Sequence, residues 1–280
     1  MVEMNTITLQ LSQKQALTLE KIYRNKAQQP PTPAIRFFAK TEGCTISLYH
    51  NYKALFQGKN AAEASARFAP VSPFPQAGSD EVGTGDYFGP VCVCACIVQD
   101  LKALEGLAVQ DSKTLTDALI LKNAPVLMER LPHSLLIVSN EKYNQVHKQH
   151  NMNQIKALLH NQAYLNLQKK YTLPPLCVID QFTPEARYYQ YLGESRETFT
   201  KIHFETKAES KYPAVACASL IARYGFLKAL EAMSEHYQFH FPKGAGAQVD
   251  SAAKAFVEQY SQSELDRVAK LHFANSAKLL

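Results

Sequence analysis

The stretch GSDEVGTGDYFGPVCVCACIV, residues 78–98, decides the fold of the larger part of this chain. Small and β-branched residues dominate it, and Gly or Pro bounds its two apolar runs, so each run is expected to be a β-strand. Cysteines alternate in the second run, at positions 92, 94 and 96, and therefore share one face of that strand. The first strand holds the adjacent acids Asp80 and Glu81, followed by Gly83, Thr84 and Gly85. Neighbouring strand residues point to opposite faces, so both acids can reach one metal only if the strand ends there.

Beyond this stretch, apolar strands alternate with helices, which is the pattern of an α/β fold with a partly parallel sheet. Further strands are expected in SLLIVSN at 134–140, PLCVIDQF at 175–182 and KIHFET at 201–206. Long helices are expected at 151–171, 214–237 and 250–262. The sequence therefore predicts a mixed central sheet flanked by helices.

The first seventy residues predict a separate small domain with the element order β-α-β-β-β-α and a hairpin turn at Glu42-Gly43. They hold nine Lys or Arg against four acids, whereas the rest of the chain has twenty-one of each. This excess is typical of polyanion binding, although a solvated basic surface gives the same count. The strands mix cations with rings, and half of the rings are expected in the core: Arg36, Lys40, Tyr49, Tyr52, Lys53 and Phe56.

The expected organisation is a basic N-terminal binding domain at 1–70, a Pro-rich linker at 71–77 and a larger domain at 78–280. No apolar run approaches the ~18 residues that a membrane span needs, and the N-terminus lacks a basic segment followed by an apolar one. A cytoplasmic monomer without membrane contact is therefore expected. The 6 cysteines include no C-x-x-C pair, which favours buried, reduced thiols over a zinc or redox site.

Two further acids are candidate metal ligands, like the adjacent pair Asp80 and Glu81. Asp180 ends the apolar run LCVI, and Glu209 lies in TKAESKYP, just before an Ala-rich helix. A buried carboxylate is costly to keep charged without a partner, and a bound cation removes that cost. Four carboxylates at strand ends suit a hard cation such as Mg²⁺ or Mn²⁺. Each acid alone also fits a helix cap, a solvated edge, or an ion pair with Lys207 or Lys211.

Five segments of the chain resemble the type 2 ribonuclease H family, and within it the ribonuclease HIII group. They are GSDEVGTGDYFGP at 78–90, DSKTLTD at 111–117, NMNQIKALLHN at 151–161, VIDQF at 178–182 and TKAESKYPAVACASLIAR at 206–223. The segments follow one another in the family's order. Glu209, where ribonuclease HII has aspartate, and the reading GTGDYFGP favour the HIII group.

The resemblance implies a ribonuclease-H-like catalytic domain, preceded by a small substrate-binding α+β domain similar to a TATA-box-binding-protein repeat. It implies an endonuclease that hydrolyses the RNA strand of RNA/DNA hybrids by a two-metal-ion mechanism and leaves 5′-phosphate and 3′-hydroxyl ends. By the same resemblance, Asp80, Glu81, Asp180 and Glu209 correspond to the metal-binding carboxylates. We hypothesise that Asp80 and Asp180 lie between the two ions, while Glu81 and Glu209 complete the coordination of one each.

Several residues are expected to contact the hybrid. The glycines of the segment 83–85 let the backbone approach the 2′-hydroxyl of RNA, unless the segment is an ordinary tight turn. A bulky residue at Gly83 should therefore cost cleavage more than folding. Ser112 and Lys113 in DSK, and Lys207 in TKAE, are candidate phosphate contacts. His160 is interpreted as a helix-surface or packing residue.

Other activities stay open at this point. A ribonuclease HII-like enzyme, which incises at single ribonucleotides in duplex DNA, would share the metal site. A duplex with one ribonucleotide, beside one with a run of several, separates these two activities. A protein that binds hybrids without cleaving them is a further alternative, against which the presence of all four acids weighs. Another nuclease or transposase of this fold lacks support, because the segments around the acids resemble type 2 sequences.

Overall fold

The computed structural model describes residues 5–66, 68, 74–109, 115–194 and 197–279. The chain divides into two compact units, Met1–Val71 and Ser72–Leu280. The first strand of the larger unit, β6 (Gln76–Val82), takes in the last two residues of the expected linker 71–77. Residues 71–73 of that linker lie outside the described part of the chain.

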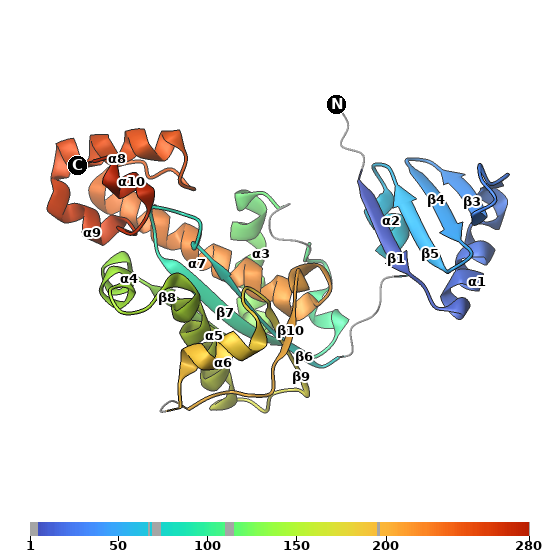
Figure 1. Cartoon of the computed structure of the whole chain (residues 1–280), viewed down its shortest axis with the longest axis horizontal. Helices are drawn as coiled ribbons and strands as arrows, with labels where there is room; N and C mark the ends of the chain where they lie inside the picture. Colours follow the sequence, from blue (N-terminus) through green and yellow to red (C-terminus); the bar gives the residue numbers. More distant parts are fainter. Residues whose placement is uncertain (1–4, 67, 69–73, 110–114, 195–196, 280) are drawn as a thin grey trace. The chain divides into compact units, whose positions relative to one another are not determined.

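Within its described residues, the N-terminal unit is an antiparallel sheet with helices (Figure 1). The sheet order is β1-β5-β4-β3-β2. The elements are β1 (Thr6–Gln10), α1 (Gln13–Ile22), η1 (Arg24–Lys26), β2 (Ala27–Gln28), β3 (Ile35–Thr41), β4 (Cys44–Tyr49), β5 (Lys53–Gln57) and α2 (Ala61–Ala66). The predicted order is confirmed, with the two-residue β2 as an additional strand. The predicted hairpin turn lies between β3 and β4, where Gly43 has a φ of 76°.

One face of this sheet carries the core of the N-terminal unit. Ile46, Ala54 and Phe56 are fully buried, in a cluster with Ala16 and Leu19 of α1. Phe56 is thus one of the predicted rings that belongs to the core.

The opposite face carries Phe38, Lys40 and Lys53. The strand register shows this, because Leu55, two residues after Lys53, pairs with Ser47, which in turn pairs with Phe38. Lys40 and Lys53 are exposed, so the charge predicted for this surface is accessible within the unit.

Arg36 has a different environment from Lys40 and Lys53. Its Nε lies 2.7 Å from Oε1 of Glu20, and its guanidinium lies 5.6 Å from the ring centre of Tyr52. Arg36 therefore joins β3 to α1 and is engaged inside the unit.

The larger unit is built on a sheet of order β10-β9-β6-β7-β8 (Figure 1). Strands β10, β9 and β6 run parallel, whereas β7 and β8 are antiparallel to their neighbours. The elements after β6 are β7 (Val91–Val98), η2 (Leu101–Leu104), α3 (Asp117–Arg130), β8 (His133–Val138), α4 (Asn140–His147), α5 (Met152–Gln168), β9 (Leu176–Asp180), α6 (Glu185–Leu192), β10 (His203–Glu205), η4 (Ala208–Ser210), α7 (Pro213–Tyr237), α8 (Ala247–Tyr260), η5 (Gln262–Glu264), α9 (Leu265–Val268) and α10 (Ala274–Ala277). The predicted mixed sheet flanked by helices is confirmed.

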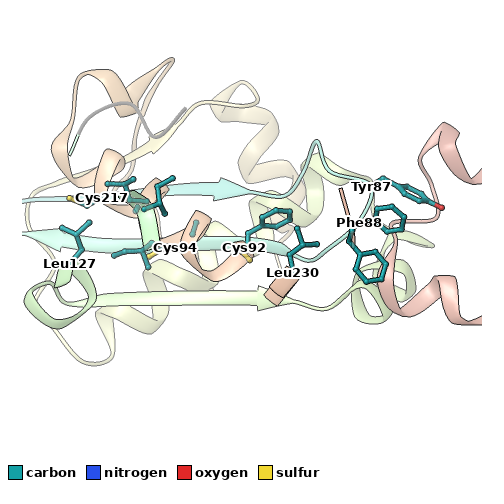
Figure 2. Packing of buried hydrophobic residues seen from close by; sticks show 14 of the residues in the cluster. Tyr87, Phe88, Cys92, Cys94, Leu127, Cys217 and Leu230 are labelled. Atoms are coloured by element: carbon teal, nitrogen blue, oxygen red, sulfur yellow. The ribbon is translucent and has the colours of Figure 1, made fainter. Parts of the chain in front are cut away.

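The two faces of β7 belong to two different cores. Cys92, Cys94 and Cys96 pack on the side of α7 and α3, together with Cys217 of α7 (Figure 2). Val93, Ala95 and Ile97 pack on the side of α5 and α6. The predicted alternation is confirmed, and all of these cysteines are free thiols. Burial raises the pKa of Cys92 to about 12, so this thiol stays protonated near neutral pH.

The helix α7 lies against β6 because small residues allow close contact. A Cβ added to Gly78 would lie 2.2 Å from the backbone nitrogen of Val215, so only glycine fits there. Pro213 opens the helix, where its missing N–H leaves no bond unmade.

By length and composition α7 could cross a membrane, so the expectation that no apolar run approaches such a length is wrong. In this structure 67% of its most apolar window is buried inside the unit, and a core helix passes the same test.

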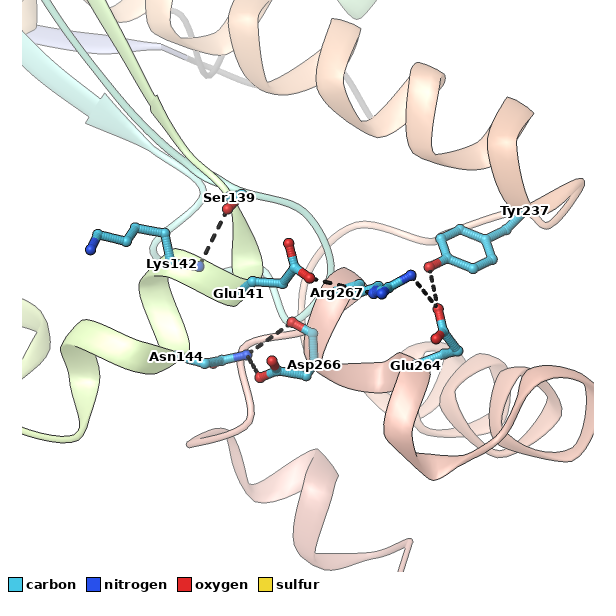
Figure 3. A network of polar contacts seen from close by, with 8 residues as sticks. All are labelled: Ser139, Glu141, Lys142, Asn144, Tyr237, Glu264, Asp266 and Arg267. Atoms are coloured by element: carbon cyan, nitrogen blue, oxygen red, sulfur yellow. Dashed lines mark hydrogen bonds and ion pairs between the residues drawn. The ribbon is translucent and has the colours of Figure 1, made fainter.

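Polar contacts join the C-terminal helices to α4 and α7 (Figure 3). Tyr237 at the end of α7 donates a hydrogen bond of 2.8 Å to Oε2 of Glu264. The buried Asn144 of α4 donates to Oδ1 of Asp266 and to the carbonyl oxygen of Ala269, each at 2.9 Å. The C-terminal segment is therefore held against α4 and α7 by specific hydrogen bonds as well as by apolar packing.

Lys270 ties this segment to the loop that follows β6. The residue is fully buried, and its ammonium donates to the carbonyl oxygens of Asp86, at 2.8 Å, and Gly89. Its backbone N–H donates to the carbonyl oxygen of Tyr87 at 2.8 Å. Burial lowers the pKa of Lys270 to about 8, although the charge of Asp86 partly opposes this shift. The loop is thus positioned by a buried cation.

We expect Lys270 to make the free energy of unfolding depend on alkaline pH. Its pKa is about 8 in the folded chain and 10.5 ordinarily, so between these values the unfolded chain binds more protons. The free energy of unfolding of the wild type, relative to that of Lys270→Met, should therefore rise by up to about 3 kcal/mol as the pH rises from about 8 to 10.5. Urea unfolding of both proteins across this window measures the difference. A difference that does not change with pH would contradict the assignment.

Candidate active site

Asp80 and Asp180 occupy neighbouring positions on two parallel strands. Ser79 of β6 pairs with Ile179 of β9, and the next residue of each strand is one of these acids. Asp80 is opposite Cys94, whose side chain belongs to the core on the α7 side. The sheet therefore brings together two carboxylates that are a hundred residues apart in the chain, both directed toward α7.

The environment of Asp80 opposes its charge. The residue is 7% exposed, and burial raises its pKa well above the ordinary value. The charges of Glu81 and Asp180 raise the pKa further, whereas hydrogen bonds from the Ser219 hydroxyl and the Glu81 backbone N–H, the latter at 2.8 Å, lower it. Dipoles alone compensate this carboxylate incompletely, and a cation beside it would favour the charged form.

Glu81 faces the other side of the sheet and has charged partners there. It pairs with Val93 in the strand ladder, on the α5 side. One carboxylate oxygen contacts the ammonium of Lys156, and the other lies 2.8 Å from Nε2 of His160. Burial would raise the pKa of Glu81, but the hydrogen bond from His160 and the charges of His160 and Lys156 lower it. Glu81 is therefore a stable anion in this arrangement.

Glu209 lies in η4, immediately before α7, and is buried. The backbone N–H of Ala208 donates to Oδ1 of Asp180 at 3.0 Å, which fixes η4 against the end of β9. Lys207, at the start of η4, is exposed and has a φ of 55°, so its backbone turns sharply there. The hydrogen bond thus attaches the segment that carries Glu209 to Asp180, the third predicted acid.

A cavity of about 460 Å³ opens at these strand ends. Asp80, Glu81 and Asp180 line it, and Arg223 of α7 and Lys243 line it as well. Glu209 lies outside this lining. A larger cavity, of about 1100 Å³, lies where β9 and β10 begin, away from the predicted residues. The smaller cavity is therefore the candidate site, because its lining combines carboxylates with basic side chains.

The two cations of the cavity are held by one acid. Asp117, at the start of α3, lies 2.9 Å from Nη2 of Arg223 and also contacts the ammonium of Lys243. The hydrogen bonds from Lys243 and Arg223 outweigh the effect of burial and lower the pKa of Asp117. This arrangement fixes two positive groups near the carboxylates, where a phosphate of a polyanion could lie.

The two glycines of the loop after β6 differ in their surroundings. Gly83 has a φ of 92°, and a Cβ there would lie 2.2 Å from the carbonyl oxygen of Pro90. The expectation that a bulky residue at Gly83 costs cleavage more than folding is therefore wrong, because the fold itself requires glycine. Gly85 is exposed, and a Cβ there would meet no heavy atom within 4 Å. Thr84, between them, lines the cavity.

Not every predicted contact can be placed. Ser112 and Lys113 lie outside the described residues. The interpretation of His160 as a surface or packing residue missed its bond to Glu81, and Lys156 was not singled out. Their spacing of four residues on one helix puts both on the same face, which could have indicated a shared partner. Asp86, which also lines the cavity, and Arg223 lie in segments that carry the resemblance but were not singled out, and Lys243 lies outside those segments.

The donor types at this site suit a hard divalent cation. Carboxylate oxygens are the ligands that Mg²⁺ and Mn²⁺ prefer, and the buried, undercompensated Asp80 would gain from a cation. Among the described residues, no group of three or more His, Cys, Asp or Glu side chains is arranged to hold a metal ion. In this arrangement Glu81 is engaged by Lys156 and His160 instead.

Comparison with known proteins agrees with the geometry. The family model for ribonuclease HII matches residues 77–276, and a domain of unknown function, DUF3378, matches residues 6–79. Ribonuclease HIII of Bacillus mycoides (strain KBAB4) is 38% identical over 304 residues, which cover 98% of this chain and 97% of that protein. The chain belongs to the ribonuclease HIII family. Ribonuclease HIII of Lactococcus lactis subsp. cremoris (strain SK11) is 41% identical over 285 residues, with 98% of each chain covered.

Solved structures of ribonuclease HIII give the same result. Bst-RNase HIII in complex with Mn²⁺ has a TM-score of 0.74 and 34% identity, with 98% of each chain covered. Aquifex aeolicus RNase H3 has a TM-score of 0.58 at 23% identity, covers 95% of this chain and 99% of its own, and supports the fold alone. The predicted family and fold are confirmed. The chain is a ribonuclease H, an endonuclease of a divalent-metal-dependent family that acts on RNA/DNA hybrids.

We expect the two loop glycines to respond differently to substitution. Gly83→Ala should destabilise the chain by about 2 kcal/mol or more, because the new Cβ both clashes with backbone and strains a left-handed conformation. Gly85→Ala should change stability by no more than about 0.5 kcal/mol, since the position is exposed and open. Urea unfolding of the two variants measures this. Equal stabilities would contradict the loop geometry.

Proposed function

We propose that this chain hydrolyses the RNA strand of RNA/DNA hybrids with two divalent ions, Mg²⁺ or Mn²⁺, and leaves 5′-phosphate and 3′-hydroxyl ends. The ions would be held by Asp80, Glu81, Asp180 and Glu209. One observation carries this proposal: Asp80 is buried beside Asp180 on paired parallel strands, facing a cavity, with too little positive charge around it. Two ions supply a nucleophilic water and stabilise the leaving oxygen in phosphodiester hydrolysis.

The protein's own residues would position the scissile bond. Arg223 and Lys243, fixed by Asp117, present positive charge in the same cavity as the carboxylates and would bind a substrate phosphate. The exposed backbone at Gly85, beside Thr84, would approach the 2′-hydroxyl, which is both donor and acceptor and distinguishes RNA from DNA. Lys207, exposed beside η4, would add a second phosphate contact.

Loss of the central carboxylates should abolish cleavage. Asp80→Asn and Asp180→Asn should each reduce metal-dependent cleavage of a labelled hybrid by at least about 10³-fold, because a lost ion ligand costs several kcal/mol of transition-state stabilisation. Glu258→Gln, an exposed change on α8, is the matched control and should keep wild-type activity. Near-wild-type cleavage by either Asn variant would contradict the assignment of the site.

The same assay separates the nearest alternatives. A duplex with a run of ribonucleotides should be cut faster than a duplex with a single one, as the resemblance to ribonuclease HIII implies. Preference for the single ribonucleotide would favour ribonuclease HII-like incision. Binding of the hybrid without cleavage, in both Mg²⁺ and Mn²⁺, would favour a non-cleaving binding protein.

We also propose that the N-terminal unit binds the hybrid's backbone through the sheet face that carries Lys40 and Lys53. Both lysines are exposed, and Phe38 shares their face. Lysine neutralises phosphates without reading sequence, and an aromatic ring such as the half-buried Phe38 can stack on a base. The core on the other face leaves this surface free of the unit's own apolar packing.

Charge removal on this face should weaken hybrid binding in a salt-dependent way. The double variant Lys40→Gln/Lys53→Gln should lower the slope of log K against log salt by about 2, because two phosphate contacts are lost. Lys14→Gln/Lys21→Gln removes the same charge from exposed positions on α1 and should keep the wild-type slope. Filter binding in Ca²⁺ or EDTA at several salt concentrations gives the slopes. Equal slopes for the two double variants would contradict the proposed face.

A further inference from the structure

We propose that Lys156 of α5 is a resident cation that competes with a divalent ion for Glu81 and thereby sets the metal affinity of the free enzyme. The proposal rests on the proposed function, since it takes Glu81 as an ion ligand. It goes beyond the family's carboxylates by assigning a role to the helix behind them. The juxtaposition that carries it is the buried group formed by Glu81, Lys156, His160 and Phe182.

Both carboxylate oxygens of Glu81 have a partner on α5. Oε1 contacts Nζ of Lys156, and Oε2 lies 2.8 Å from Nε2 of His160. The side chains of Glu81, Lys156 and His160 are 12%, 10% and 0% exposed. Salt screens such a buried group little, so the ammonium is a strong local charge. A buried carboxylate with this partner needs no metal ion to remain charged.

The two partners differ in how firmly they are held. His160 is locked, because its Nδ1 lies 2.6 Å from Oγ of Ser79 and its ring stacks on Phe182 at 5.4 Å between centres. Lys156 has a long, flexible side chain, and its ammonium lies 4.0 Å from the ring centre of Phe182. If the ammonium leaves Glu81, it can keep this cation–π contact. His160 is therefore a fixed positioning residue, and Lys156 is the exchangeable partner.

Exchange follows from the position of Glu81 near the end of β6. The acid lines the same cavity as Asp80 and Asp180, so an ion held by those two carboxylates would lie within its reach. A divalent ion that takes an oxygen of Glu81 must displace the ammonium or remain close to a like charge. Either event lowers the ion's affinity. Lys156 thus holds the Glu81 carboxylate in place before the ion binds, and it lowers the affinity of the divalent ion for that carboxylate.

The test measures the affinity of the full-length chain for Mn²⁺ in the absence of nucleic acid. Two methods give this affinity: calorimetry and the electron paramagnetic resonance signal of free Mn²⁺. Lys156→Gln should bind Mn²⁺ at least about tenfold more tightly than the wild type, because the competing charge is gone. Lys156→Arg keeps the charge and should stay within about twofold of the wild type. Lys169→Gln removes the same charge from the exposed end of α5 and should also stay near the wild type.

A double-mutant cycle shows whether the effect passes through Glu81. In a Glu81→Gln background, Lys156→Gln should no longer tighten Mn²⁺ binding, because the carboxylate for which the Lys156 ammonium and Mn²⁺ compete is absent. Thermal unfolding gives a second readout: Lys156→Gln should have a lower Tm than the wild type without Mn²⁺ and a larger rise in Tm when Mn²⁺ is added. If the Gln variant does not fold, Lys156→Met, whose apolar stem can still pack on Phe182, carries the same expectations.

Three results would overturn the proposal, and they differ from one another. Unchanged or weaker Mn²⁺ binding by folded Lys156→Gln, with binding lost in Asp80→Asn, would reject the competition while the metal site stands. If Lys169→Gln tightened Mn²⁺ binding as much as Lys156→Gln does, the effect would come from the net charge of the chain and not from competition for Glu81. Absence of Mn²⁺ binding in the wild type and in every variant would reject the proposal together with the metal site itself.

Discussion

The charge of Asp80 is the constraint on which the site of this ribonuclease H depends. The carboxylate is buried at the edge where two parallel strands end, with Asp180 beside it, and a hydroxyl and a backbone N–H donate to it. Such a group is either protonated or balanced by a cation. The sheet, the close contact of α7 at Gly78 and the bond from Ala208 to Asp180 all fix this unfavourable arrangement in place. Stability gained in two apolar cores offsets its cost.

The adjacent acids Asp80 and Glu81 have different surroundings, because successive side chains of a strand point to opposite faces of the sheet. The charge of each buried carboxylate is therefore compensated by different groups. Asp80 faces α7, where its carboxylate has dipoles but no base among the causes that set its pKa. Glu81 faces α5, where Lys156 and His160 hold it as an anion. The charged form of Asp80 would thus be stabilised by a bound cation, whereas the charge of Glu81 is already compensated by Lys156 and His160. In the proposed metal site, this asymmetry would give Asp80 and Glu81 different free-energy costs of binding an ion, although the two acids are adjacent in the sequence.

Much of this arrangement could be predicted from sequence, because it follows from periodicity. The alternation of Cys92, Cys94 and Cys96 gave their common face, and apolar runs ending in an acid gave the edge of the sheet where Asp80 and Asp180 meet. The steric role of Gly83 was missed, since the carbonyl of Pro90 that excludes a Cβ is brought back by the turn itself. Lys156 and His160 were missed because their partner lies on a strand about eighty residues earlier. Their helical spacing indicates a shared partner, but it does not indicate which residue of a distant element that partner is.

The loop after β6 illustrates why a site needs parts of the chain that carry no motif. In the proposed function, the exposed backbone at Gly85 approaches the 2′-hydroxyl of RNA, and a mobile loop there would lose conformational entropy when the substrate binds. The C-terminal part of the chain holds this loop in place. The Lys270 ammonium donates to two carbonyl oxygens of the loop, the N–H of Gly244 donates to Oδ1 of Asp86, and the carbonyl oxygen of Gly244 accepts from the N–H of Tyr87. The neighbouring Lys243 reaches the cavity itself. In the proposed function, the segments that carry Gly244 and Lys270 would therefore act on substrate recognition through the loop that they hold in place.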